Sequence, residues 1–263
     1  AVRFASDHDL PVAVTATGHG PALPADGALL INLRRMNDVS IDVAARTATV
    51  GAAVEMQHVV DLAAEAGLAP LAGSSPNVGV VGYLLGGGLS PSLGRSHGWA
   101  VDQVLSAEIV TADGELRAID ARTEPDLFWA IRGGKGNFGV ITSLTFALVP
   151  LTRLYGGGLY FDGADTRAVL EAFRRLTATA PEELTASVAL LRMPPLPFVP
   201  EPLRGRLSVH LRVAYLGSAE DGESLLTEVR KVATPIIDDV RDRPFTEFAA
   251  IHADPVDPLP VYE

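Results

Sequence analysis

The chain has 263 residues, 48% of them hydrophobic and 20% charged, so it is long enough for one large domain or two smaller ones with substantial cores. Its net charge of −11 argues against nucleic acid or an anionic membrane surface as a partner, because both require clustered Lys and Arg side chains. The absence of cysteine excludes disulfides, thiolate catalysis and iron–sulfur clusters.

Signals for membranes, secretion and metal binding are also missing from the sequence. No apolar run reaches the roughly 18 residues that a membrane-spanning helix needs. Residues 1–7 lack the basic and apolar regions of a signal peptide, so we expect no membrane partner and a cytoplasmic location. No two of the six histidines have the i, i+4 spacing of a metal pair, so we expect no metal site.

The first 150 residues alternate short strands with a few helices. We expect the end of a helix over 1–9, then strands over 10–15, 28–32, 39–42 and 47–51, the last two as a hairpin. Helical spacing predicts a helix over 54–66 that ends at Gly67. The pair Asp113-Gly114 predicts a hairpin between 102–111, which begins as a loop, and 115–120. A short helix over 125–132 and a strand over 140–148 follow.

Beyond Pro150, which we take as a domain boundary, the pattern predicts a second α+β domain. The expected strands cover 156–161, 187–192 and 207–215, the expected helices cover 165–179 and 219–233, and a proline-rich loop covers 194–202. In 207–215, alternation places Ser208, His210 and Arg212 on one face. That face either turns toward a ligand or is the solvated side of a half-exposed sheet.

The stretch Gly73–Leu89 is the most unusual in composition. Six of its seventeen residues are glycine, and none is charged. Glycine at this density is typical of a backbone that closely approaches another group or requires left-handed dihedrals. Two interpretations remain: a neutral cradle for a large flat ligand that carries phosphate, or a tightly packed turn region in a β-rich core.

Two smaller glycine-containing segments differ in their context. The turn Thr15–Gly20 follows a predicted strand and contains His19 between two glycines; a lone turn histidine is more often ordinary than functional. Gly134–Gly139 fits G-x-G-x-x-G, but a helix precedes it and a strand follows it. A dinucleotide fingerprint needs the reverse order, so we reject that interpretation.

Taken together and in this order, Thr15–Gly20, Gly73–Gly88 and Gly136–Thr142 resemble FAD-linked oxidoreductases of the vanillyl-alcohol-oxidase type, in particular the berberine-bridge-enzyme-like branch and microbial sugar oxidases. The resemblance is close over 1–150 and only general beyond. It implies an α+β fold: a two-subdomain PCMH-type FAD-binding domain over 1–150, followed over 151–263 by part of a substrate-binding α+β domain with an antiparallel sheet.

The resemblance also implies roles for individual residues. Backbone amides of Thr15–Gly20 would form an anion nest for the FAD diphosphate, which needs no Lys or Arg. His19 matches the histidine that many relatives join covalently to the flavin, so FAD would be bound covalently through His19 only. The full set of expected cofactor-binding residues is Thr15, Ala16, Thr17, Gly18, His19, Gly20, Gly73, Ser74, Val78, Gly79, Gly82, Gly88, Gly98, Asp102, Val104, Gly139 and Ile141.

The chain departs from the family pattern in three ways. Ser75 stands near the position of the cysteine that forms a second flavin bond in bicovalent members. His97 replaces an aromatic residue before Gly98. Family members are also longer, so we expect the natural polypeptide to extend beyond both ends, with the usual catalytic base in the later part; the catalytic residues are therefore unknown.

The resemblance implies an FAD-dependent oxidoreductase, an oxidase by preference, which removes a hydride from a C–H of an alcohol, sugar or secondary metabolite. Electrons would pass to O2 or another acceptor. Two alternatives stay open: a truncated or degenerate flavin-binding module without activity, and an NADPH-dependent reductase of the same fold group. The sequence does not define the substrate or the oligomeric state.

Overall fold

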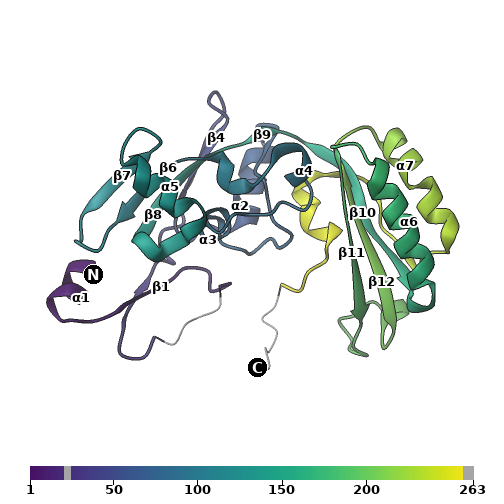
Figure 1. The fold of residues 1–263 in the computed structure, drawn as a ribbon, viewed down its shortest axis with the longest axis horizontal. Helices are drawn as coiled ribbons and strands as arrows, with labels where there is room; N and C mark the ends of the chain where they lie inside the picture. The colour runs from purple at the N-terminus through teal and green to yellow at the C-terminus, as the bar shows by residue number, and fades with distance from the viewer. Residues whose placement is uncertain (21–24, 257–263) are drawn as a thin grey trace. The chain divides into compact units, whose positions relative to one another are not determined.

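The computed structural model describes residues 1–20 and 25–256, which form two compact units (Figure 1). Unit 1 comprises Ala1–Ser90 and Trp99–Leu151, and unit 2 comprises Pro91–Gly98 and the described chain from Thr152 onward. The segment Pro91–Gly98 lies within the first 150 residues but packs with unit 2. The reason is local, because Arg95 Nη1 donates to the Leu184 carbonyl oxygen at 2.8 Å.

Unit 1 is built on an antiparallel sheet of five strands in the order β3-β4-β8-β6-β7, with a parallel pair β1-β2 and a short pair β5-β9. Its strands are β1 (Val12–Thr15), β2 (Leu29–Asn32), β3 (Val39–Asp42), β4 (Thr47–Gly51), β5 (Leu68–Ala69), β6 (Val104–Val110), β7 (Leu116–Asp120), β8 (Val140–Ala147) and β9 (Val149–Pro150). Its helices are α1 (Val2–Asp7), α2 (Met56–Ala64), α3 (Val80–Leu85) and α5 (Pro125–Gly134), with the 3-10 helices η1 (Ala100–Gln103) and η2 (Lys135–Phe138).

The local signals in the sequence explain most of these elements. Helix α2 buries Met56, Val59, Val60 and Ala63 on one side, as the predicted helical spacing requires, and Gly67 follows it with φ +70°. The predicted Asp113-Gly114 hairpin joins β6 to β7, with Gly114 at φ +75°. Each of these predictions is confirmed because short-range patterns alone determine the element.

Helix α3 is a feature that the glycine content did not predict. It lies inside the stretch Gly73–Leu89 and contains Gly82. All four of its Val and Leu side chains are buried, so burial offsets the poor helix propensity of glycine. The glycine-rich stretch is therefore a short helix between two tightly packed bends.

Unit 2 is a second antiparallel sheet with two long helices, in agreement with the predicted antiparallel α+β domain. Its strands follow the order β11-β12-β10-β13, and β14 also pairs with β10. The strands are β10 (Arg153–Asp162), β11 (Leu184–Arg192), β12 (Leu207–Tyr215), β13 (Ile237–Asp238) and β14 (Arg241–Pro244). The helices are α4 (Gly94–His97), α6 (Thr166–Thr179) and α7 (Ala219–Val232), with the 3-10 helices η3 (Gly163–Asp165), η4 (Glu201–Leu203) and η5 (Phe245–Ile251).

Helices α6 and α7 cover one face of this sheet (Figure 1). The core between them contains Leu159 and Phe161 of β10 and Val209 and Leu211 of β12. Helix α7 begins at Ser218, whose hydroxyl accepts a hydrogen bond from the Asp221 amide. The apolar side chains of β12 therefore lie on the face that packs against the helices, and the polar residues lie on the other face, as the predicted alternation requires.

The opposite face of the unit 2 sheet differs from one of the two expectations. Ser208 and His210 are fully buried there, with 0% of their surface exposed. The interpretation of this face as the solvated side of a half-exposed sheet is therefore wrong for these two residues. Burial of polar side chains on a regular strand is unfavourable unless they have hydrogen-bond partners.

Within residues 1–20 and 25–256, no helix has the length and apolar character needed to cross a bilayer. The same residues contain no group of three His, Asp or Glu side chains arranged to hold a metal ion.

Candidate functional site

The turn Thr15–Gly20 leaves β1 and exposes its backbone. Gly18 has φ +84°, a conformation that side chains rarely adopt. No atom of the described residues lies within 4 Å of the position that a Cβ would take at Gly18 or at Gly20. Both glycines are exposed, so the backbone at this end of the turn is open to a ligand, as a backbone anion nest requires.

Thr17 joins this turn to the glycine-rich stretch. A Cβ at Gly79 would lie only 2.9 Å from Thr17 Oγ1 and 3.1 Å from Thr17 Cγ2. Gly79 is held in place by an isolated bridge to Glu55 and precedes α3 directly. The close approach of Thr17 explains why position 79 has no side chain.

His19 makes the second contact between the same two segments. Its Nε2 lies 2.9 Å from Asn77 Oδ1, and Ser75 Oγ donates to that same oxygen at 3.0 Å. With the amide oxygen facing the ring, His19 Nε2 carries the proton and Nδ1 keeps a free lone pair. Sequence reasoning missed Asn77, because an asparagine between proline and valine gives no signal of its own.

Ala16 packs on the other side of the turn. It contacts a small buried cluster formed by Leu33, Ala52 and Val140, next to Val110. Val140 lies between two predicted cofactor residues, Gly139 and Ile141.

Gly139 and Ile141 have structural reasons for their identities. A Cβ at Gly139 would collide with the Val110 carbonyl oxygen and approach Ile109 Cγ1 to 2.8 Å. Ile141 is 6% exposed and pairs with Ile109 across β6 and β8. Their predicted contact with a cofactor stays a prediction.

A bend after α3 connects the glycine-rich stretch with η1. The Ala100 amide donates to the Gly88 carbonyl oxygen at 2.9 Å, and the Val101 amide donates to the Gly87 carbonyl oxygen at 3.0 Å. Gly88 has φ +67°, and a Cβ there would lie 2.7 Å from Ala100 Cβ. Position 88 therefore requires glycine for two independent reasons.

Tyr83 fills the space between Gly73 and Gly88. Cβ atoms at these glycines would lie 3.1 Å from Tyr83 Cε2 and Cε1, respectively. The Tyr83 hydroxyl is buried and has no hydrogen-bond partner within residues 1–20 and 25–256, and burial raises its pKa. An orphaned buried hydroxyl beside a glycine surface is a polar group that a ligand can satisfy.

The remaining predicted residues of the glycine-rich stretch occupy two different settings. Ser74 and Val78 are half-buried, and the Val78 carbonyl accepts from the Met56 amide at 2.9 Å. Gly82 lies on the exposed side of α3, with no atom of the part of the chain that the structure describes within 4 Å of a Cβ position. These positions line or support the open face of the helix.

The segment from Gly98 to Val104 is anchored at several points. Gly98 ends α4 with φ +77°. Asp102 is exposed and forms an ion pair with Arg132 at 3.1 Å, and Val104 is buried at the start of β6. Asp102 and Val104 thus have structural partners of their own.

Lys135 brings a positive charge to the glycine-rich surface. A Cβ at Gly86 would lie 2.5 Å from Lys135 Cε and 3.2 Å from its Nζ, so the side chain lies directly over the end of α3. The sequence shows no Lys or Arg within Gly73–Leu89, and only the fold reveals this neighbour. Near the C-terminal end of a helix, an ammonium group also interacts favourably with the helix dipole.

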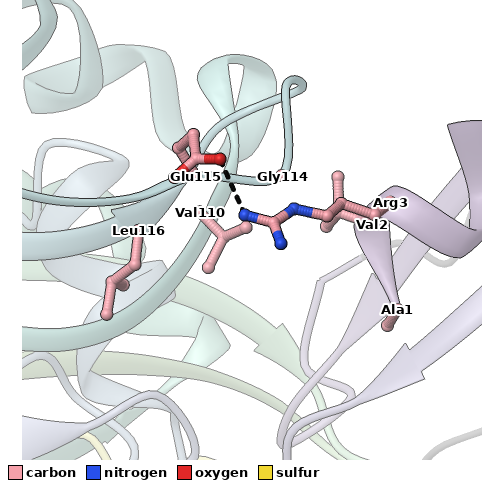
Figure 2. A pocket seen from close by; sticks show the side chains of 7 residues that line it. All are labelled: Ala1, Val2, Arg3, Val110, Gly114, Glu115 and Leu116. Atoms are coloured by element: carbon pink, nitrogen blue, oxygen red, sulfur yellow. Dashed lines mark hydrogen bonds and ion pairs between the residues drawn. The ribbon is translucent and has the colours of Figure 1, made fainter.

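Two pockets on unit 1 lie elsewhere. Figure 2 shows one of about 420 Å³ between α1 and the β6–β7 hairpin, where Arg3 and Glu115 form an ion pair at 2.7 Å. The other, of about 560 Å³, is lined by residues of β4, β6, β7 and β8. None of the predicted cofactor residues lines either pocket, so the candidate site is the open surface of the turn and the glycine-rich stretch.

Comparison with known proteins gives this geometry its context. Residues 1–120 match the FAD binding domain family. The FAD-linked oxidoreductase azaL of Aspergillus niger is 35% identical over 190 residues, which is 70% of this chain and 40% of the relative. The (R)-6-hydroxynicotine oxidase of Paenarthrobacter nicotinovorans is 32% identical over 256 residues, 97% of this chain and 54% of the relative.

A solved structure supports the same conclusion for the fold. The crystal structure of 6-hydroxy-D-nicotine oxidase from Arthrobacter nicotinovorans aligns with a TM-score of 0.83 and 28% identity, over 96% of this chain and 55% of that one. The predicted fold class, with its PCMH-type FAD-binding domain, is confirmed. The chain is a homologue of FAD-linked oxidoreductases and carries their FAD-binding domain. It spans about half the length of the hydroxynicotine oxidase and less of azaL.

The residues present fit an FAD diphosphate. Glycines 18, 20 and 82 leave space where side chains would stand, and the buried Tyr83 hydroxyl has no hydrogen-bond partner among the described residues. The cofactor FAD follows from the family, whereas the contact of each residue with it stays a prediction.

Proposed function

We propose that this protein is an FAD-dependent oxidase that removes a hydride from a small molecule, at a carbon bearing an alcohol or amine group. Bound FAD supplies the chemistry, because its flavin accepts a hydride from substrate and passes the electrons to O2 or another acceptor. The relatives named as oxidases support this reaction class. The substrate and the electron acceptor are part of the proposal.

The observation that carries the proposal is the convergence of three chain segments on the turn Thr15–Gly20. Thr17 packs against Gly79, His19 lies 2.9 Å from Asn77 Oδ1, and Ala16 joins the cluster of Val140. These segments are distant in sequence, yet each contains glycines with open or closely approached backbone. Such a surface suits an elongated ligand that binds backbone amides along its length.

His19 is the proposed covalent tether of the flavin. It is exposed, so a ligand can reach it, and Asn77 holds its Nε2 at hydrogen-bond distance. The arrangement leaves Nδ1 as the ring nitrogen with a lone pair available for a bond to carbon. Asn77 is accordingly a positioning residue for this bond, acting through the tautomer of His19.

The first experiment is to express the chain, add FAD and record the visible spectrum after removal of free cofactor. Retained flavin absorbance supports the proposal, and a chain that stays colourless overturns it. Gly79→Val tests the site, because the larger side chain would displace Thr17 and should abolish retention. Gly136→Ala is the control, since no atom lies within 4 Å of a Cβ there.

Acid precipitation of the flavin-loaded protein tests the tether separately. Flavin should stay in the pellet for the unmodified chain and move to the supernatant for His19→Ala. Asn77→Leu should slow the attachment, whereas His8→Ala, an exposed histidine bonded to its own helix, should not. Complete release from the unmodified chain would defeat the His19 bond and leave the binding of FAD intact.

Activity is tested last, with a panel of alcohols, sugars and amines and with O2 consumption as the readout. A chain that retains FAD but reduces it with none of these substrates would favour the flavin-binding module. Rapid reduction by NADPH would favour the reductase.

A further inference from the structure

Unit 2 contains an arginine, Arg212, whose surroundings differ from those of the other buried or half-buried arginines. Five of the chain's arginines are buried or half-buried. Four of them have a carboxylate partner within ion-pair distance, and these are Arg117, Arg132, Arg230 and Arg243. Arg212, at the middle of β12, has none among residues 1–20 and 25–256. A half-buried guanidinium without an anion is costly, so it points to a missing partner.

Arg212 is oriented by His210 on the same strand. Its Nε donates to His210 Nδ1 at 3.1 Å. Because arginine cannot accept a hydrogen bond, His210 Nδ1 must be the acceptor and its proton must lie on Nε2. Burial, with the charges of Arg212 and His252, lowers the pKa of His210 to about 3, which keeps the ring neutral and able to accept.

The surroundings fix the imidazole rigidly. His210 is 0% exposed and stacks on Tyr160, with ring centroids 3.9 Å apart. A Cβ at Gly158 would collide with His210 Nε2, so the glycine on β10 makes room for the ring. A rigid acceptor at Nε leaves the two Nη groups of Arg212 as a preorganised fork.

Neighbouring strands add small polar groups beside that fork. Arg212 is directly opposite Ser187 on β11 and Gly158 on β10, and paired residues of antiparallel strands share a face. Among the residues that the structure describes, the Ser187 hydroxyl is buried without a partner, and so are those of Thr185 and Ser208 on the same face. Several orphaned polar atoms on one sheet face indicate that this face binds something beyond the described residues.

We propose that Arg212, positioned by His210 and flanked by Ser187, binds a carboxylate of the substrate, so that the protein acts on a small carboxylic acid. The proposal rests on the proposed function only where it calls the bound acid a substrate. The anion site itself is inferred from residues of unit 2 alone. Arg212 is the binding residue, and His210 acts only through it.

Charge favours a carboxylate over a phosphate. The fork of one guanidinium matches the two oxygens of one carboxylate, and it supplies a single positive charge. His210 is neutral, and burial lowers the pKa of His252 to about 4, so neither adds a second charge at neutral pH. Asp239 and Asp254 lie close enough to act on Tyr160 electrostatically, which further disfavours a dianion.

The test is a titration of the full chain, labelled with ¹⁵N-arginine and ¹⁵N-histidine, with acetate. Acetamide serves as the neutral molecule of the same shape. Acetate should shift the Arg212 Nε–H and His210 Nε2–H signals, and acetamide should not. Arg212→Gln should weaken acetate binding by about 10- to 100-fold, the range expected for hydrogen bonds to a charged group.

Matched variants separate the site from general charge effects. Arg206→Gln removes an exposed arginine near the start of the same strand, and it should leave acetate binding unchanged. His210→Gln keeps an acceptor for Arg212 and should retain binding, whereas His210→Leu should weaken it. Circular dichroism and thermal unfolding identify any variant that fails to fold. If Arg212→Gln fails to fold, Arg212→Lys replaces it in the comparison with the unmodified chain, because lysine keeps the positive charge but lacks the forked guanidinium.

Four outcomes overturn the proposal: equal shifts with acetate and acetamide, no shift with acetate at tens of millimolar, unchanged binding in Arg212→Gln, or tighter binding of inorganic phosphate than of acetate. The titration is run with and without FAD. Acetate binding through Arg212 in a chain that retains no FAD would sink the proposed function but keep the anion site. Retention of FAD with no acetate binding would contradict the anion site and leave the proposed function intact.

Discussion

The two units present polar groups to potential ligands in opposite ways. In unit 1 the candidate surface is backbone, with open glycines at 18, 20 and 82 and no charged side chain within Gly73–Leu89. In unit 2 it consists of side chains on regular strands, with Arg212 held by His210. A site made of backbone amides can be recognised in the sequence by its glycines. A site made of side chains on a strand cannot, because its residues follow the usual alternation of polar and apolar positions.

The same contrast governs stability. Unit 1 depends on positions that exclude any side chain, such as Gly88 against Ala100. Unit 2 depends on buried polar side chains that need their partners, such as Arg243. The two units should therefore be destabilised by different kinds of substitution.

Arg243→Ala should have the largest effect and should act on unit 2. Arg243 is 0% exposed; its Nε donates to the Gly156 carbonyl oxygen at 2.9 Å, and its Nη2 donates to Asp239 Oδ2 at 2.8 Å. Loss of a fully buried side chain leaves a cavity and leaves the Gly156 carbonyl oxygen without its donor, which together cost about 3–5 kcal/mol. Denaturant unfolding measures the loss. Arg241→Ala, at an exposed ion pair with Glu247, should cost less than about 1 kcal/mol.

Gly88→Ala should have the next largest effect and should act on unit 1. The substitution places a Cβ 2.7 Å from Ala100 Cβ at a residue with φ +67°. Left-handed strain and overpacking together should reduce the free energy of unfolding by about 2–4 kcal/mol. Gly87→Ala, where the nearest atom would be Trp99 Cε3 at 3.9 Å, carries strain without the clash and should cost about half as much. Equal costs would mean that the Ala100 contact contributes nothing.

Sequence reasoning recovered most of unit 1 for a physical reason. The spacing of apolar residues and the residue types of a turn are local properties, so α2 and the Asp113-Gly114 hairpin could be predicted from their own residues. Helix α3 was missed because its stability comes from burial of four apolar side chains, which propensity does not reveal. Asn77 was missed because its importance comes from His19, 58 residues away in the chain.

The polar cluster of unit 2 shows the corresponding limit. Alternation placed Ser208, His210 and Arg212 on one face correctly, but it could not tell whether that face is buried. Burial depends on the register, which puts Tyr160 and Gly158 of β10 opposite His210 and Arg212. Non-local pairing of this kind leaves no periodic signal in any one strand.

The stability of the fold should fall as pH decreases from about 6.5, and unit 2 should cause it. The pKa of His210 is lowered to about 3, first by burial, whereas in the unfolded chain it is near 6.5. Between pH 6.5 and 3 the unfolded state therefore binds a proton that the folded state does not bind. The contribution of neutral His210 to the free energy of unfolding is fully present above pH 6.5 and is lost progressively toward pH 3. The slope from one such residue is at most about 1.4 kcal/mol per pH unit.

Unfolding curves between pH 7 and 5 measure this dependence, because the carboxylates with lowered pKa values, such as Asp113 at about 2, do not titrate there. His252, whose pKa is lowered to about 4, contributes in the same direction. His210→Gln should reduce the slope by about half, since each buried histidine refuses one proton. An unchanged slope would contradict the burial of a neutral His210.

Gly82→Ala should have the smallest effect on stability and the most informative one on function. Gly82 lies inside α3 with no atom within 4 Å of a Cβ, so alanine should stabilise the FAD-free chain by about 0.5–1 kcal/mol. If that open face contacts the flavin, the same methyl group should weaken FAD binding. Unfolding and FAD titration of one variant thus separate the two reasons for a glycine. Gly136→Ala, at a position that is equally open but not among the expected cofactor-binding residues, should leave FAD binding unchanged. A stabilised Gly82→Ala with undiminished FAD affinity would move the flavin away from α3, and recognition in unit 1 would then depend on the turn Thr15–Gly20 alone.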